Sequence, residues 1–378
     1  MDPSRGNNEQ LERACQQQPD CREVSLKGCK HVTNLSPLYT LRQLWRLNLQ
    51  GCVNVVDNET LSLISQHNRR LSRLNLCGCE KITDARPLAQ LPYLFDLNLS
   101  GCNIGNDSLD EIAMHCQQLS RLAINSCPRL TNIAVLLHLK MLKLLYCRYS
   151  ENISIDSVGS VLVTNGSVLL TLNIDGLRFD QLSIANLPHH SSLNYLNMKD
   201  NVVLVSLEWL TKVADRLGEL EMLDVEGCEA LADIRGVELF PKLKVLRLSR
   251  TAVSVEAVLQ TVPKCKELTT LSLDGCPHLF TDGDSAVNLA ELITPLKHLK
   301  KLILPQSLQG TPAVAEIKDR VEVIYVNPPN NNNNNNSTTN NNNNNLTVPN
   351  HFHSPGGSAH HSSFTTPTTH KVPQLPSM

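Results

Sequence analysis

The sequence predicts an α/β solenoid: a curved horseshoe in which a parallel sheet lines the concave face and helices and turns cover the convex face. Three observations support this prediction. A short leucine pattern recurs along most of the chain, it recurs about every 25 residues, and a helical pattern follows it in alternate copies. A self-similar period of this length is typical of repeats that each form one coil and stack on their neighbours.

The repeating unit has the form L-x-x-L-x-L-x-G-C, as in LRQLWRLNLQGC at 41–52. Its L-x-L segment has the two-residue period of a strand, and a turn follows the closing residue, which we call the anchor. Such strands must stack in parallel through right-handed crossovers. The predicted anchors are Cys29, Cys52, Cys79, Cys102, Cys127, Cys147, Leu177, Asn201, Cys228, Thr251, Cys276 and Ser307. A weak further copy uses Val321, Ile324 and Val326.

The repeats divide the chain into three predicted parts. Residues 1–20 form an N-terminal cap segment with a short helix, and residues 21–326 form a solenoid of about 12–13 repeats. Residues 327–378 contain the asparagine runs 330–336 and 340–345 and then a Ser/Thr/Pro/His-rich stretch. This composition offers too little apolar surface to offset the entropy lost on ordering, which predicts a disordered, low-complexity tail.

Long copies carry a helical pattern after the turn. In LDEIAMHCQQL at 109–119, apolar residues recur at three- and four-residue steps. Short and long copies alternate through Cys276, which suggests a unit of two coils. Two copies are stretched, at 148–168 and 277–299, and their extra length predicts a projecting loop or a longer helix.

On these motifs the chain resembles leucine-rich repeat proteins, over about residues 10–326. The segment LDEIAMHCQQLSRLAINSCPRLTN is similar to the cysteine-containing subtype, L-x-x-I-A-x-x-C-x-x-L-x-x-L-x-L-x-x-C-x-x-I-T-D. Short copies such as VTNLSPLYTLRQLWRLNLQGC resemble the repeats of internalin-type and phosphatase-regulator-type proteins, which normally carry Asn at the anchor. The asparagine tracts resemble those of several protozoan lineages. The resemblance implies the fold and says little about function.

The anchors are predicted to be buried. Each points inward where the chain leaves its strand, and a buried backbone group at that turn needs a partner. Asparagine is a strong partner, and cysteine is a small apolar residue with a weak S–H donor. Adjacent anchors could approach disulfide distance, but thirteen cysteines and no signal peptide favour reduced thiols. A ladder spreads its ligands too far for zinc, so no metal site is predicted. The predicted Cys/Asn ladder is Cys29, Cys52, Cys79, Cys102, Cys127, Cys147, Asn201, Cys228 and Cys276.

The residues that flank each inward leucine are predicted to line the concave face and to bind a protein partner. An asparagine column runs between the inward positions, basic residues concentrate in early repeats and acidic residues in later ones. Two interpretations remain open: polar side chains that keep an exposed sheet soluble, or a charge-graded groove that selects a partner. The predicted partner-binding residues are Arg46, Asn48, Arg73, Asn75, Asp96, Asn98, Arg121, Lys143, Asn173, Asp175, Tyr195, Asn197, Asp224, Glu226 and Arg247.

Composition and motifs argue against several classes of function. With 34 basic and 36 acidic residues, the chain has no polybasic character for nucleic acid. It has no run of about 18 apolar residues for a membrane span and no apolar signal-peptide core. We therefore expect a cytoplasmic protein, with nuclear or cytoskeletal association also possible. The sequence has no G-x-S-x-G, phosphate-loop, H-E-x-x-H or dinucleotide-binding glycine pattern, so we predict no enzyme activity and no cofactor.

The leading hypothesis is a non-enzymatic protein–protein interaction scaffold, either a monomer or part of a hetero-complex. One alternative is a substrate-recognition subunit of a ubiquitin ligase. The segment before the first strand is too short for an F-box, so another subunit would have to supply that module. A second alternative is a structural component of a cytoskeletal or flagellar assembly. A secreted or surface effector is disfavoured, because signal and lipid-anchor motifs are missing.

Overall fold

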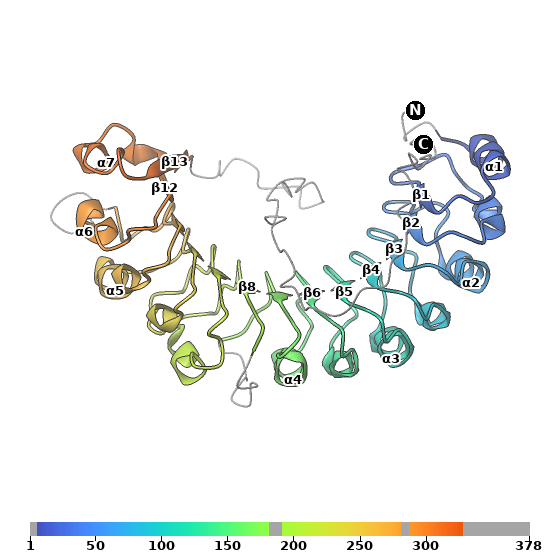
Figure 1. Ribbon diagram of the computed structural model, residues 1–378, viewed down its shortest axis with the longest axis horizontal. Helices are drawn as coiled ribbons and strands as arrows, with labels where there is room; N and C mark the ends of the chain where they lie inside the picture. Colours follow the sequence, from blue (N-terminus) through green and yellow to red (C-terminus); the bar gives the residue numbers. More distant parts are fainter. Residues whose placement is uncertain (1–5, 181–190, 281–286, 328–378) are drawn as a thin grey trace, which may run out of the picture. The chain divides into compact units, whose positions relative to one another are not determined.

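The computed structural model describes residues 6–180, 191–280 and 287–327. These residues form an array of coils whose strands make one 13-stranded parallel sheet, in sequence order from β1 to β13. Within this array the sheet lines the concave side and the helices stand on the convex side (Figure 1). The strands are β1 (Glu23–Ser25), β2 (Arg46–Asn48), β3 (Arg73–Asn75), β4 (Asp96–Asn98), β5 (Arg121–Ala123), β6 (Leu144–Tyr146), β7 (Thr171–Asn173), β8 (Tyr195–Asn197), β9 (Met222–Asp224), β10 (Val245–Arg247), β11 (Thr270–Ser272), β12 (Lys301–Pro305) and β13 (Glu322–Val326).

Helices of two kinds cover the convex side. The α-helices are α1 (Asn8–Gln17), α2 (Asn58–His67), α3 (Asn106–His115), α4 (Ile155–Asn165), α5 (Val255–Thr261), α6 (Leu289–Ile293) and α7 (Pro312–Ala315). The 3₁₀ helices are η2 (Ser36–Thr40), η3 (Arg86–Gln90), η4 (Ala134–His138), η5 (Glu208–Lys212), η6 (Val237–Leu239), η7 (Val262–Lys264) and η8 (Gln306–Leu308). The two kinds alternate from α1 to α4. Between Asn201 and Cys228 the long copy holds η5 instead of an α-helix, so the predicted helix pattern is wrong there.

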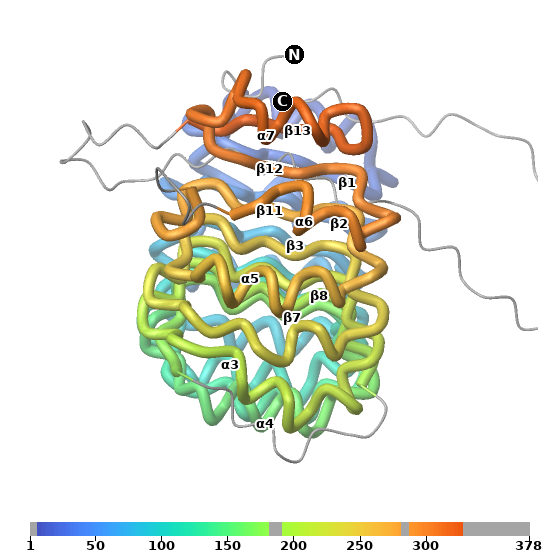
Figure 2. Tube along the Cα trace, turned by 90° about the vertical axis from the view of Figure 1, so that its left-hand side faces the viewer, coloured from blue at the N-terminus to red at the C-terminus, as the bar shows by residue number. Residues whose placement is uncertain are grey.

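The leucines of the L-x-L segments build the core. Leu47 and Leu49 are both buried, and the sheet register places Leu47 between Val24 and Leu74 of the adjacent strands. Inward side chains therefore form continuous columns through the array. Figure 2 shows the coils stacked one on the next, so each coil buries its apolar residues against its two neighbours.

Asparagine side chains at the starts of α1, α2 and α3 join these long coils to the short coils that follow them. Asn58 Nδ2 donates to Thr83 Oγ1 at 2.8 Å, while Asn58 Oδ1 accepts the Thr83 N–H at 2.9 Å. Equivalent contacts join Asn8 to Thr33 and Asn106 to Thr131. This recurrence supports the two-coil unit that the alternating repeat lengths suggest.

The structure corrects the anchor predicted at Cys147. Strand β6 pairs with β5 so that Leu145 lies opposite Leu122. Cys147 is therefore the second inward residue of its coil, and Ser150 is the anchor. The string MLKLLYC has leucines in two registers, and its terminal cysteine favoured the wrong one.

The corrected anchor removes a predicted irregularity. Ser150 lies 23 residues after Cys127, an ordinary short step, and its Oγ donates to the Ile124 carbonyl at 2.8 Å. The stretched copy predicted at 148–168 is thus a consequence of the register error. Helix α4 covers this coil as α2 and α3 cover theirs.

The last strand also differs from its predicted register. Val323 lies opposite Leu302, and Val323 and Tyr325 pack against the core. Ile324 and Val326, which the pattern placed inward, are exposed. The run EVIYV is apolar in both phases, so alternation alone could not choose between them.

Several predictions fall partly outside the described residues. The cap segment 1–20 contains α1, whose start is fixed by reciprocal hydrogen bonds between Asn7 and Gln10. The tail after Asn327 and the middle of the second stretched copy, 281–286, lie outside the described residues. Within the described part of the chain, no helix is long and apolar enough to cross a membrane.

Candidate partner-binding face

Three columns of side chains cover the concave face from β2 to β11. The first column is Arg46, Arg73, Asp96, Arg121, Leu144, Thr171, Tyr195, Met222, Val245 and Thr270. The middle column is Asn48, Asn75, Asn98, Ala123, Tyr146, Asn173, Asn197, Asp224, Arg247 and Ser272. The third column, two residues further on, is Gln50, Cys77, Ser100, Asn125, Arg148, Asp175, Lys199, Glu226, Ser249 and Asp274. Every predicted partner-binding residue except Lys143 lies in one of them.

The asparagines of the middle column have a structural task. Asn75 Oδ1 accepts the N–H of Cys77 at 3.0 Å, and Asn98 Oδ1 accepts the N–H of Ser100 at 3.0 Å. Asn48, Asn173, Asn197 and Asp224 make the same bond to the residue two positions on. An Asn or Asp side chain thus satisfies a backbone donor where each strand ends. The recurrence of asparagine follows from this bond and needs no partner to explain it.

Lys143 is displaced by the register correction. It precedes β6, and its place in the first column belongs to Leu144, with Tyr146 in the middle column. Both side chains are half-buried, as are those of Tyr195, Met222 and Val245 further along the first column. We call these five residues the apolar floor: Leu144, Tyr146, Tyr195, Met222 and Val245. Of these five residues only Tyr195 was among the predicted binding residues, and the register error put Lys143 in the place of Leu144.

The early repeats present arginines beside aromatic rings. The Arg73 guanidinium lies 5.4 Å from the Trp45 ring centroid, and the Arg121 guanidinium lies 5.4 Å from that of Tyr146. Arg121 Nε also lies 3.8 Å from Asp96 Oδ1. These cation–ring contacts hold the guanidinium groups in place without neutralising them.

Arg46 differs from the other two arginines because it has a closer acidic partner. Its Nη1 lies 3.3 Å from Glu23 Oε2. Together Arg46, Arg73 and Arg121 form the basic end of the concave face.

The acidic residues predicted for the later repeats are paired within the protein. Asp224 Oδ2 accepts from Arg247 Nη1 at 3.0 Å, and Asp175 Oδ2 accepts from Arg148 Nε at 2.8 Å. Both aspartates are 1% exposed. Burial raises the pKa of Asp224 and of Asp175, and the paired arginines oppose that shift. The later repeats therefore do not offer the free acidic surface that the charge count predicted.

A row of left-handed backbone positions follows the third column. Most turns have glycine there, such as Gly176 at φ 73° and Gly227 at φ 74°, because glycine has no Cβ to clash. Tyr149, Asp200 and Arg250 occupy the same place at φ 50°, 56° and 57°. Such a conformation costs a non-glycine residue about 1 kcal/mol, so other contacts must hold these three residues in place.

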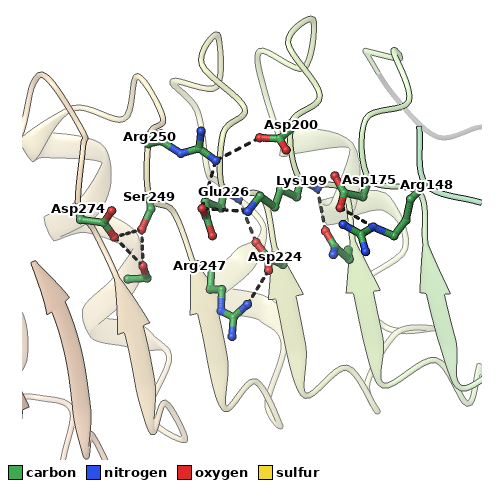
Figure 3. Close-up of polar contacts among 12 residues, drawn as sticks. Arg148, Asp175, Lys199, Asp200, Asp224, Glu226, Arg247, Ser249, Arg250 and Asp274 are labelled. Carbon is green, nitrogen blue, oxygen red and sulfur yellow. Dashed lines mark hydrogen bonds and ion pairs between the residues drawn. The ribbon is translucent and has the colours of Figure 1, made fainter. Parts of the chain in front are cut away.

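The contacts that hold them span two coils. Tyr149 OH donates to Asp200 Oδ2 at 2.9 Å, and Arg250 Nη2 donates to Asp200 Oδ1 at 3.2 Å. Arg250 also donates to Glu226 Oε1 at 3.1 Å, which accepts from Lys199 Nζ at 3.0 Å (Figure 3). We call these five residues the rim bridge: Tyr149, Lys199, Asp200, Glu226 and Arg250.

Glycines leave the space that the rim bridge crosses. A Cβ on Gly176 would overlap the Tyr149 ring, and a Cβ on Gly227 would overlap the Asp200 carboxylate. Because glycine lies between the long side chains at these turns, each long side chain can extend across the neighbouring coil to the coil beyond it. The bridge ties together the coils that carry the apolar floor.

The anchors form the expected interior ladder, except that Ser150 replaces Cys147 and the predicted anchor Ser307 is exposed in η8. Cys52 Sγ donates to the Leu26 carbonyl at 3.0 Å, and Cys102 Sγ donates to the Leu76 carbonyl at 3.3 Å. Asn201 Nδ2 donates to a carbonyl at a different place in the preceding coil, that of Phe179, at 2.7 Å. None of the thirteen cysteines forms a disulfide in the structure, and all but Cys77 are buried. No group of His, Cys, Asp or Glu in the described part of the chain could hold a metal ion.

Burial also makes the ladder thiols poor nucleophiles. Burial raises the pKa of Cys52 to about 12 and that of Cys79 to about 11. Because the thiolate is the reactive and metal-binding form, these groups serve packing and weak hydrogen bonding.

A second ladder was not among the predicted sites. Cys116 Sγ donates to the Leu88 carbonyl at 3.4 Å, and Asn68 Nδ2 donates to the Leu38 carbonyl at 2.9 Å. Asn165 Nδ2 does the same with the Leu136 carbonyl. Each follows or ends the α-helix of a long coil. The cysteine of the I-A-x-x-C segment could have predicted this second ladder. Cysteine and asparagine replace each other in it, as they do at the anchors.

Neither a family model nor a curated protein sequence matches the chain. Solved structures do. An internalin from Listeria monocytogenes matches with 20% identity and a TM-score of 0.53, covering 79% of this chain and 88% of its own. A leucine-rich repeat protein from Leptospira interrogans matches with 18% identity and a TM-score of 0.55, covering 82% and 91%. A chain of the Rad7 and Elc1 complex from yeast matches with 16% identity and a TM-score of 0.52, covering 86% and 88%. At these identities the similarity concerns the fold alone, and the array is an α/β leucine-rich repeat solenoid.

Proposed function

We propose that this protein is a non-enzymatic interaction scaffold that binds a protein partner on its concave face. The observation that carries the proposal is the combination, on one side of the sheet, of the basic end with the apolar floor. Arginine and tyrosine side chains are the types that contribute most to protein interfaces. An exposed apolar surface flanked by polar residues is typical of an interaction site.

The asparagine column and the later acidic residues contribute in a different way. The asparagines complete the strand ends, and the buried aspartates neutralise Arg148 and Arg247. These contacts keep the face regular and rigid, so less ordering is needed when a partner binds. Partner selection would then depend on the basic end and the apolar floor.

Proximity labelling with the intact protein tests the proposal. A variant with Arg46→Glu, Arg73→Glu and Arg121→Glu should lose most labelled partners. The reversed charges slow the association with a partner and repel the partner surface that the arginines attract. The matched control reverses three exposed cations on the convex side, Arg13, Lys140 and Lys212. Equal recovery of partners by both variants would exclude binding at the basic end.

The ubiquitin-ligase and cytoskeletal alternatives remain predictions without a structural observation that favours them. The similarity to a chain of the Rad7 and Elc1 complex is one of fold and does not transfer that partner. Co-purification of cullin or adaptor subunits would support the first alternative. Retention in a detergent-extracted cytoskeleton would support the second.

A further inference from the structure

Within the basic end, Arg73 has no ion pair in the described part of the chain and Arg121 has only a long one. Among the described residues, no carboxylate lies within ion-pair distance of Arg73, which rests on the Trp45 ring. Arg121 is half exposed, and its nearest carboxylate oxygen, on Asp96, is 3.8 Å away. A partner with carboxylates at this position would gain both charge pairing and fixed guanidinium geometry.

Apolar surface lies where the strands that carry these arginines begin: Ser72 precedes Arg73, and the Arg121 N–H donates to the Phe95 carbonyl at 3.0 Å. Tyr93 and Phe95 are 63% and 44% exposed and line an open hollow with Ser72, Pro92 and Gln118. This hollow lies at the amino-terminal ends of β3 to β5, next to Arg73 and Arg121. The apolar floor continues the same face from β6 to β10.

The opposite edge of the face is already neutralised. In the rim bridge, Lys199 and Arg250 share Glu226, and Asp200 accepts from both Arg250 and Tyr149. The side chains at that edge are therefore held in place by one another, and little of their charge is left without a partner. The remaining net attraction is for a segment that combines negative charge with apolar side chains.

The dimensions fit a short extended segment. From β3 to β9 the face crosses six strand spacings, which is about 29 Å and equals about nine extended residues. Single-stranded nucleic acid fits less well, because its backbone needs a continuous basic track and the floor contains Leu144, Met222 and Val245. A phosphate chain laid along this path would leave most of its charges unpaired.

We propose that the concave face binds an extended acidic segment of a partner protein, with carboxylates at Arg73 and Arg121 and bulky apolar side chains in the Tyr93–Phe95 hollow and on the apolar floor. This inference rests on the proposed scaffold function and names the chemistry of the partner. A random library of twelve-residue peptides displayed on phage, selected against the intact protein, tests it directly.

Selected peptides should be enriched in Asp and Glu together with Phe, Trp, Leu or Ile. Binding of the best peptide should weaken by about tenfold or more in Arg73→Glu, and also as salt rises from about 50 to 300 mM. Met222→Ser should weaken it by about fivefold through lost apolar contact. Lys212→Glu, on the convex side, is the matched control and should leave the affinity unchanged.

Arg73→Gln guards against misfolding of the reversed variant, since it removes the charge and keeps a long polar side chain. Enrichment of basic or uncharged peptides, or no enrichment, would overturn the partner chemistry. Tighter binding of a uridine twelve-mer than of any peptide would overturn it in favour of RNA. Proximity labelling that still depends on the basic end would then leave the scaffold function standing and refute only this inference.

Discussion

At the scale of single residues, the cysteines show how burial decides chemistry. Twelve of the thirteen lie inside the array as thiols, and one, Cys77, lies half-buried in the third column of the concave face. Their recurrence could suggest disulfides or a metal. The anchor cysteines lie at the turn, where Sγ of Cys52 and of Cys79 donates to a carbonyl of the neighbouring coil, and this position explains them as a small substitute for asparagine.

We expect iodoacetamide to modify Cys77 first in the folded protein. The other thiols should react only after denaturant is added, because burial blocks access and raises their pKa values. Peptide mapping by mass spectrometry measures the order of modification, and Cys77→Ser should remove the early product. Early modification of the ladder thiols, or their recovery as disulfides, would refute the interior ladder.

The buried Asp224–Arg247 pair should respond asymmetrically to substitution. Arg247→Ala should cost about 3 kcal/mol, because it leaves a buried carboxylate without its cation. Asp224→Asn should cost less than about 1 kcal/mol, because Asn keeps the oxygen that accepts the Glu226 N–H and Arg247 can reach water.

Urea unfolding at several pH values measures both variants. Without Arg247, the folded-state pKa of Asp224 lies further above its unfolded value, so the deficit should shrink as pH falls and Asp224 is protonated. A larger loss in Asp224→Asn than in Arg247→Ala would contradict this account.

At the scale of elements, the rim bridge shows that coils are joined by more than the sheet ladder. Tyr149, Asp200 and Arg250 recur at two-coil intervals, with Gly176 and Gly227 at the turns between them. The sequence shows the substitutions at these turns, but only the stacked coils show that the long side chains meet. The sequence pattern could not predict these hydrogen bonds, because they join residues about fifty positions apart in the chain.

Glycine substitutions should separate backbone strain from bridge disruption. Gly51→Ala and Gly176→Ala share φ 73°, so each should cost about 1 kcal/mol for the left-handed conformation. Gly176→Ala should cost about 1–3 kcal/mol more, because its Cβ overlaps the Tyr149 ring, whereas open space surrounds a Cβ at Gly51. Chemical denaturation measures the difference, and Tyr149→Ala should remove the excess in Gly176→Ala. Equal losses at both glycines would show that the ring moves freely.

At the scale of the whole array, stability depends on contacts between neighbouring coils. Each strand pairs only with the strands before and after it. A fault in one coil should therefore weaken its neighbours more than distant coils.

Leu172→Ala in β7 should cost about 3 kcal/mol, because the side chain is fully buried. Amide exchange should accelerate mainly in the coils of β6 to β8, with little change near β1 and β2. Hydrogen–deuterium exchange by mass spectrometry resolves the coils separately. Uniform acceleration across the array would indicate that it unfolds as one cooperative unit.

The sequence by itself determined the solenoid, the inward columns and the burial of the thiols, because these depend on a local period that every coil repeats. It also located fourteen of the fifteen predicted concave residues in the correct columns. The tertiary structure decided the register at Leu145 and Val323, where leucines or β-branched residues occupy both phases and only pairing with the next strand selects one. It also decided which charged side chains are left unpaired and available to a partner protein, since Asp175 and Asp224 are neutralised by arginines from neighbouring coils.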